Sequence, residues 1–288
     1  MLKNAVIAGL LLMLGCREEA PVDSAAADVD CDGLGDSLVL VTRKLTFGRA
    51  EDGVSPGFDL DDRVSDITDD VACNVADYTS PEGVPGIDNS IAALLPILEE
   101  TEGAALEPLV QDSINGGALL LMMELTDLDS TENDACVDLA VFKGQGSPMI
   151  GNDGWLLPNQ TLEIDPTSAV NEIPNQAVID GRLEAGPIPE VSLVLQVLDL
   201  NTVVVLSNVR IRLEPQDDGT WTGMLAGGVA VQDLVDAATL QNVDPAVFEL
   251  IGPVLTLIAD LDPGEDAVCQ RISMTMEVEA VPAFVFEG

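Results

Sequence analysis

Four aspartates near the N-terminus are spaced as oxygen ligands for a hard cation. Counted from Asp28, acids stand at positions 1, 3, 5 and 9 (Asp28, Asp30, Asp32 and Asp36), and Gly33 stands at position 6. A tight turn aims alternate carboxylates at one centre, and the glycine permits the sharp bend. These four residues are therefore candidate ligands for Ca²⁺, the one cofactor that the sequence indicates.

This stretch is similar to the D-x-D-x-D-G loops of calcium-binding repeats. It departs from them at position 12, where Val39 replaces a bidentate Glu, so coordination needs a carboxylate from elsewhere. The segment from Gly48 to Gly86 could supply it with Asp59, Asp61, Asp62, Asp66, Asp69, Asp70 and Asp77. A solvated acidic turn and a solvated loop would have the same composition, so both interpretations stay open.

The strongly acidic composition of the chain limits the classes of partner that it can bind. Only 11 Lys and Arg residues stand against 51 Asp and Glu residues, which gives a formal net charge of −40. Such a surface repels nucleic acid and anionic lipid headgroups and attracts cations, so we exclude nucleic acid and keep divalent cations as partners. The hydrophobic content of 47% still provides a sizeable core.

The chain has no histidine. This excludes Ser-His-Asp and Cys-His nucleophile systems and two-histidine zinc sites. The match of Gly53–Gly57 to G-x-S-x-G is accidental, because Pro56 has no N–H to donate and no histidine is present. We therefore predict that the protein is not an enzyme and assign no catalytic residue. A hydrolase acting through carboxylates is the third alternative.

The first sixteen residues form an export signal. Lys3 precedes an apolar run from Ala5 to Leu14, and a small residue and Cys16 follow. The run Leu12-Met13-Leu14-Gly15-Cys16 resembles the lipobox of bacterial lipoproteins. The resemblance implies that residues 1–15 are a signal peptide and that Cys16 becomes the first residue, with acyl chains on its sulfur and amine. The alternative is an ordinary signal peptide in which Cys16 is incidental.

The residues after Cys16 suggest where the protein resides. Residues 16–30 are acidic and Ala-rich and are predicted to be a tether. Arg17, rather than Asp, follows Cys16; by resemblance to lipoprotein sorting, this favours the outer membrane, with periplasmic or surface exposure left open. The chain resembles the uncharacterised acidic lipoproteins of Gram-negative bacteria. No protein partner is predicted.

Lipidation of Cys16 leaves four cysteines, which are Cys31, Cys73, Cys136 and Cys269. An even number in an exported chain predicts two disulfides, and four cysteines allow three connectivities. Of these we favour Cys31 with Cys73 and Cys136 with Cys269.

Hydrophobic periodicity predicts eight strands and four helices. The strands are Ser37–Phe47, Ala118–Leu125, Val137–Phe142, Ala177–Leu183, Val191–Leu198, Val203–Leu213, Thr220–Leu225 and Ile272–Glu279. The first helix has an apolar stripe from Ile87 to Leu98 and is predicted to be capped by Asp88. The other helices are Leu106–Ile114, Val231–Leu240 and Ala246–Leu261. The predicted fold class is α+β, with a largely antiparallel curved β-sheet or β-sandwich and two helical pairs packed on it.

We divide the chain into an Asp-rich N-terminal segment (31–86), with one strand and a long loop, and an α+β domain (87–288) that forms one unit with it. Arg210 and Arg212 share one strand face, and we expect Glu277 or Glu279 to pair with them. The predicted function is that of a lipid-anchored, non-catalytic envelope lipoprotein with a structural, adhesive or ligand-binding role, stabilised by Ca²⁺. The alternative is a periplasmic carrier of a lipid or other apolar ligand.

Overall fold

The computed structural model describes residues 31, 33–69, 73–99, 106–197, 200–240, 252–264 and 268–286. The signal segment, Cys16, the tether and three of the candidate Ca²⁺ ligands (Asp28, Asp30 and Asp32) lie outside the described residues. None of the helices in the described ranges is both long enough and apolar enough to span a membrane.

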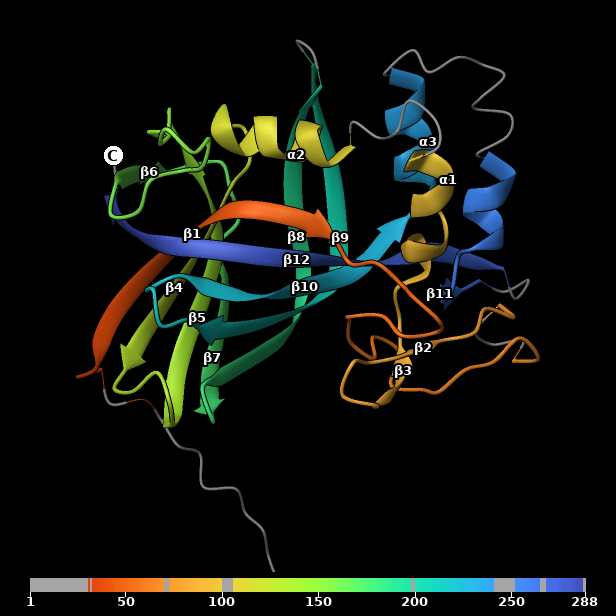
Figure 1. Ribbon diagram of the computed structural model, residues 1–288, viewed down its shortest axis with the longest axis horizontal. Coiled ribbons are helices and arrows are strands. Elements are labelled where there is room, and N and C mark those ends of the chain that lie inside the picture. Colours follow the sequence, from red (N-terminus) through yellow and green to blue (C-terminus); the bar gives the residue numbers. More distant parts are fainter. Residues whose placement is uncertain are drawn as a thin grey trace, which may run out of the picture.

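Eight long strands close into an antiparallel barrel (Figure 1). In order around the barrel they are β1 (Asp36–Phe47), β4 (Leu120–Leu128), β5 (Asp134–Gln145), β7 (Asn171–Ile179), β8 (Arg182–Val197), β9 (Leu200–Pro215), β10 (Trp221–Ala230) and β12 (Cys269–Phe286). Each strand pairs antiparallel with the next, and the pairing of β12 with β1 closes the ring. Spatial order follows chain order, so the barrel has up-and-down connectivity.

The predicted α+β class is wrong, because the structure is 53% strand and 13% helical. The error has two physical sources. Periodicity within a strand does not encode which strands pair at a distance, and closure joins β1 to β12 from the two ends of the described chain. The predicted strand Ala177–Leu183 contains the end of β7, a two-residue turn at Asp180 and Gly181, which both have positive φ, and the start of β8.

Pairing register places large apolar side chains on the inner face of the barrel. Leu40 of β1 is opposite Met123 of β4, which is opposite Val141 of β5, and each is at most 1% exposed. The same face continues around the ring through Ile211, Leu213, Leu225, Met276 and Val278. A closed ring of eight strands leaves an interior just wide enough for side chains to fill. The described interior is therefore a packed apolar core.

The helices are short and lie against the outside of the barrel and at its ends. They are the 3₁₀ helix η1 (Ser90–Ala93), α1 (Leu95–Glu99), α2 (Leu106–Asn115) and α3 (Val231–Leu240), with further helical residues at 252–257. α2 packs on β1 and β8, and η1 packs on β12. Two small strands extend the sheet: β6 (Thr161–Ile164) beside β5 and β12, and β11 (Leu261–Pro263) beside β12.

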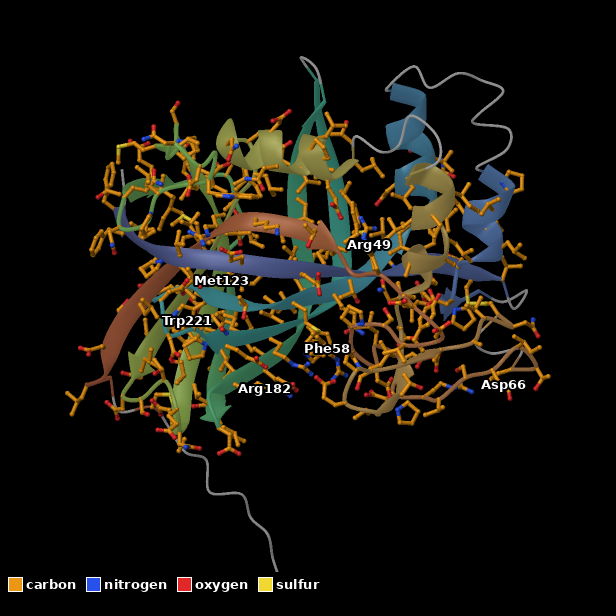
Figure 2. The ribbon with its side chains drawn as sticks, viewed as in Figure 1. Arg49, Phe58, Asp66, Met123, Arg182 and Trp221 are labelled. Carbon is orange, nitrogen blue, oxygen red and sulfur yellow. A yellow bond between two sulfur atoms is a disulfide. The ribbon has the colours of Figure 1, made fainter. Side chains whose placement is uncertain are left out.

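Between β1 and η1 the chain forms a separate structure, which we call the acidic lobe (residues 48–69 and 73–89). It contains the two-stranded sheet of β2 (Tyr78–Thr79) and β3 (Pro85–Ile87) and is otherwise irregular. Phe58 and Leu60 of the lobe pack with Ala226 and Leu261 to form a small second core. Phe58 lies on the side of the lobe nearest the barrel, whereas Asp66 lies at its outer edge (Figure 2).

Two disulfides are present, as predicted, but their connectivity differs from the predicted one. Cys31 pairs with Cys136 of β5, and Cys73 of the lobe pairs with Cys269 of β12. The two bonds span 105 and 196 residues of sequence. Each bond therefore ties a segment outside the barrel to a barrel strand, which no local pattern of cysteine spacing could reveal.

Candidate cation site

The acidic cluster, which we define as Asp59, Asp61, Asp77 and Asp88, lies within the lobe. Its first two members arise from alternation in the sequence Phe58-Asp59-Leu60-Asp61. Because successive side chains of an extended chain point to opposite sides, Phe58 and Leu60 enter the second core and the two aspartates face away from it. The alternation therefore directs two carboxylates to one place.

Asp88 joins the cluster from the residue that follows β3. It forms an isolated antiparallel bridge with Phe58, and its backbone N–H donates to Phe58 O over 2.9 Å. Its carboxylate Oδ2 accepts a 2.6 Å hydrogen bond from the backbone N–H of Leu60. The predicted role of Asp88 as a helix cap is wrong, because the cap position of η1 is Asn89 and makes no side-chain cap bond.

Carboxylate oxygens of Asp59, Asp61 and Asp88 all lie within 4.8 Å of one another. Asp88 is 2% exposed. Oδ1 of Asp61 is buried and accepts no hydrogen bond in the described part of the chain. A buried oxygen without a donor is costly, and three converging carboxylates repel one another. The cluster therefore offers the oxygen ligands that a hard cation prefers, and a bound cation would offset the repulsion between its carboxylates.

Burial and mutual repulsion change the acidity of these groups. Burial raises the pKa of Asp88 to about 9, and the nearby carboxylates of Asp260, Asp61 and Asp77 raise it further against the lowering effect of the Leu60 N–H. Burial likewise raises the pKa of Asp77 to about 6 and the pKa of Asp61 above its usual value. Without a neutralising ion, the fold disfavours the charged forms of these carboxyl groups.

Gly86 keeps the cluster compact. Its φ is +87°, and a Cβ at this position would lie 2.7 Å from Arg63 O and 3.3 Å from Asp59 Oδ2. A larger residue would therefore be strained and would push the backbone of β3 away from Asp59. The same loop is fixed by the Arg63 N–H, which donates to Asp59 Oδ1 over 3.0 Å.

The structure does not bring the predicted N-terminal ligand to this cluster. Asp36, the one described member of that set, is exposed at the start of β1, at the end of the barrel away from the lobe (Figure 1). The lobe acids Asp59, Asp61 and Asp77 were predicted only as additions to the N-terminal set. The signal that could have separated Asp59 and Asp61 from the other acids is their alternation with the buried residues Phe58 and Leu60.

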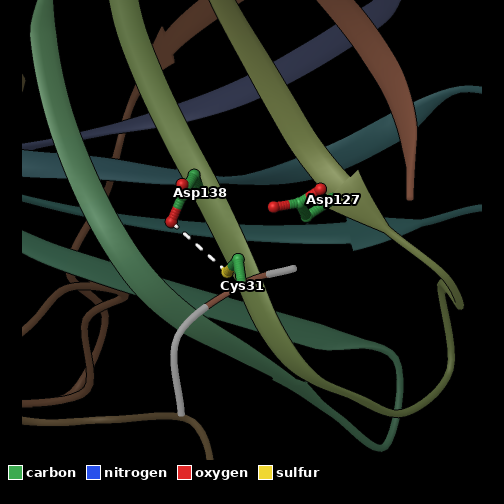
Figure 3. Close-up of side chains that lie close together, drawn as sticks. All are labelled: Cys31, Asp127 and Asp138. Carbon is green, nitrogen blue, oxygen red and sulfur yellow. Dashed lines mark hydrogen bonds between the residues drawn. The ribbon is translucent and has the colours of Figure 1, made fainter. Parts of the chain in front are cut away.

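A second group of potential ligands, Cys31, Asp127 and Asp138, lies at the N-terminal end of the described chain (Figure 3). Cys31 Sγ lies 3.5 Å from Asp138 Oδ1, but a sulfur in a disulfide has no proton to donate and is no thiolate ligand. Asp127 accepts hydrogen bonds from the backbone N–H groups of Gly33 and Gly35. These acids are engaged in structural contacts, so we do not treat the group as a cation site.

Asp260, Ser273 and Ser90 form a buried group of one carboxylate and two hydroxyls. Asp260 accepts hydrogen bonds from the N–H and hydroxyl of Ser273 and from the hydroxyl of Ser90, over 2.8 Å for the N–H and 3.1 Å for Ser90. The three residues are at most 5% exposed. Because the hydroxyls are buried and already paired, this trio joins η1 to β12 rather than presenting a nucleophile.

The arginines predicted to pair with Glu277 or Glu279 have other partners. Arg210 pairs with Asp62 of the lobe over 3.1 Å, and Arg212 pairs with Glu184 of β8 over 2.7 Å. Glu279 pairs with Arg43 of β1 instead. Because β10 lies between β9 and β12, acids on β12 are two strands away from both arginines.

No protein-family model, curated protein or solved structure matches this chain.

Proposed function

We propose that the protein is a lipid-anchored, non-catalytic component of the cell envelope, held at the outer membrane by acyl chains on Cys16 and stabilised by Ca²⁺ in the acidic cluster. The observation that carries the calcium part is the buried Oδ1 of Asp61, which has no donor among the described residues and lies beside Asp59 and Asp88. The anchor rests on the lipobox resemblance at residues 12–16.

Ca²⁺ suits this cluster better than Mg²⁺ or a transition metal. The available donors are carboxylate oxygens, with no imidazole and no thiolate beside them. Ca²⁺ accepts six to eight oxygen ligands in flexible geometry, whereas Mg²⁺ needs a near-ideal octahedron. Asp59, Asp61 and Asp88 would hold the ion, Asp77 would complete the negative shell, and water would fill the remaining positions.

Bound Ca²⁺ would stabilise the attachment of the lobe to the barrel. Asp88 begins the buried sequence Asp88-Asn89-Ser90, whose last two side chains form hydrogen bonds to β12. Asn89 donates to Gly48 O and Ser55 Oγ and accepts from the Thr275 N–H of β12. Neutralising Asp88 therefore favours the conformation that places Asn89 and Ser90 against β12.

Calcium titration of the purified protein, after treatment with a chelator, tests the cation part. At a hundredfold excess over the dissociation constant, Ca²⁺ should raise the Tm by about 5 °C or more. Asp61→Asn should remove most of that rise while leaving the chelated protein as stable as the wild type or more so, because the substitution relieves repulsion. Asp66→Asn is the matched control, since Asp66 lies at the outer edge of the same lobe (Figure 2).

Equal calcium responses of Asp61→Asn and Asp66→Asn would show general charge screening and would contradict the site. The anchor is tested separately by metabolic labelling with palmitate: the wild-type chain should be labelled and Cys16→Ser should not. Label that persists in Cys16→Ser would contradict lipidation at Cys16 without bearing on the calcium site.

A further inference from the structure

A pocket of about 300 Å³ lies where β7 and β8 separate. These strands pair only through Val178 with Leu183 and Ile179 with Arg182, although both continue well beyond. Past that point, the β8–β9 hairpin projects above the barrel (Figure 1). Residues of β4, β5, β7, β8 and β9 line the resulting hollow.

One side of the pocket is apolar. It is lined by Leu121 and Val191, each 4% exposed, and by Val203, which is 50% exposed. At roughly 30 Å³ for each water-sized atom, the volume suits about ten non-hydrogen atoms. This is the small end of the range for ligand pockets, too small for a lipid with two acyl chains.

The other side presents one cation with spare donors. Lys143 Nζ contacts Asp165 Oδ2 over 3.0 Å, and an ammonium group has three N–H donors. Oδ1 of Asp165 is occupied by the backbone N–H and hydroxyl of Thr167, and these bonds together with Lys143 lower the pKa of Asp165 to about 2. Asp165 therefore stays charged and holds Lys143 at the pocket wall with N–H groups left to donate.

The same side presents acceptors. Glu190, an exposed residue of β8, is among the residues that line the pocket, and within the described part of the chain its carboxylate forms no ion pair or hydrogen bond. Asn171 donates through Nδ2 to Glu190 O over 3.0 Å, which leaves its Oδ1 as an acceptor. Lys143, Glu190 and several apolar residues thus line the same small pocket.

We propose that this pocket binds a small zwitterion with an apolar side chain, the chemistry of a free apolar α-amino acid. The ligand carboxylate would pair with Lys143, its ammonium group with Glu190 and Asn171 Oδ1, and its side chain would pack on Leu121 and Val191. The two charges of a zwitterion complement Lys143 and Glu190, whereas a purely anionic ligand would leave Glu190 without a partner of opposite charge. The inference does not depend on the anchor or on the calcium site.

Isothermal titration of the purified protein with L-leucine and two matched analogues tests the pocket. 4-Methylpentanoate lacks the ammonium group, and 3-methylbutylamine lacks the carboxylate. Leucine should bind, and each analogue should bind at least about tenfold more weakly, because each lacks one of the two charge-assisted contacts.

Variants assign the two charges. Lys143→Gln should weaken leucine binding at least about tenfold but should not weaken 3-methylbutylamine binding, and Glu190→Gln should weaken leucine binding but should not weaken 4-methylpentanoate binding, because each substitution removes a like charge that the analogue would meet. Glu172→Gln, on β7 beside Asn171 but outside the pocket lining, is the control and should bind leucine normally.

Absence of leucine binding at about 10 mM, ten times a millimolar dissociation constant, would overturn the proposal. So would 4-methylpentanoate binding as tightly as leucine, which would indicate an apolar acid as the ligand. An undiminished affinity in Glu190→Gln would overturn the assignment of the ammonium partner.

Discussion

The barrel and the acidic lobe bury their side chains by different means. The barrel fills its interior mainly with apolar residues from eight paired strands, and these side chains need no partner beyond apolar contact. The lobe has only two very short strands and buries Asp88 among other carboxylates. Apolar burial is indifferent to ions and pH, whereas carboxylate burial depends on both. The stability of the two regions should therefore respond to different conditions.

The largest expected effect is in the barrel. Leu40→Ala removes a fully buried side chain from the strand that closes the ring. It should lower the free energy of unfolding by about 3 to 4 kcal/mol, because the cavity cannot be refilled. Urea denaturation should give the same loss in calcium and in chelator. Ile67→Ala, at a 72% exposed lobe position, is the control and should change stability little. A strongly calcium-dependent loss in Leu40→Ala would contradict the contrast between the two regions.

An intermediate effect is expected at Asp260, which joins β12 to η1, the element directly after the lobe. Burial raises the pKa of Asp260 to about 6, against the lowering effect of its hydrogen bonds from Ser273 and Ser90. The folded state therefore binds a proton that the unfolded state has already released, and the free energy of unfolding falls as pH rises from about 4 to about 6. Two pKa units correspond to about 3 kcal/mol.

Asp260→Asn tests this dependence. In chelator, the free energy of unfolding of the variant should fall less than that of the wild type between pH 4 and pH 6.5, and the two slopes should agree above that range. Chemical denaturation at several pH values measures the difference. Parallel curves for the two proteins would show that Asp260 is ionised throughout.

The smallest effect is expected from the ion pair across the surface between the regions. Arg210 contacts Asp62, which is 83% exposed, and Arg210 Nε is buried without a hydrogen-bond partner among the described residues. Exposed ion pairs contribute little, and the unpaired Nε offsets that contribution. Arg210→Gln should therefore change the free energy of unfolding by less than about 0.5 kcal/mol. A loss of more than about 2 kcal/mol would show that this pair, rather than Asn89 and the second core, holds the lobe.

Local structure followed from the sequence where one physical cause dominated. The helix at Val231–Leu240 and the strand beginning near Ser37 were predicted from hydrophobic spacing, because period and propensity agree there. The last strand was predicted too short: it was expected to end at Glu279, yet β12 continues to Phe286. Asp88 was misassigned because a capping aspartate and a buried aspartate before a helix look alike in sequence.

The sequence by itself determined the strand periodicity, the number of cysteines available for disulfides, the absence of histidine chemistry and the acidic character of the lobe. These follow from residue type and near-neighbour spacing. Only the tertiary structure decided that β12 closes on β1, that Cys31 pairs with Cys136 and Cys73 with Cys269, and that Asp88 meets Asp59 and Asp61. Each of these joins residues far apart in the chain, and their proximity results from the packing of the whole barrel rather than from any local preference.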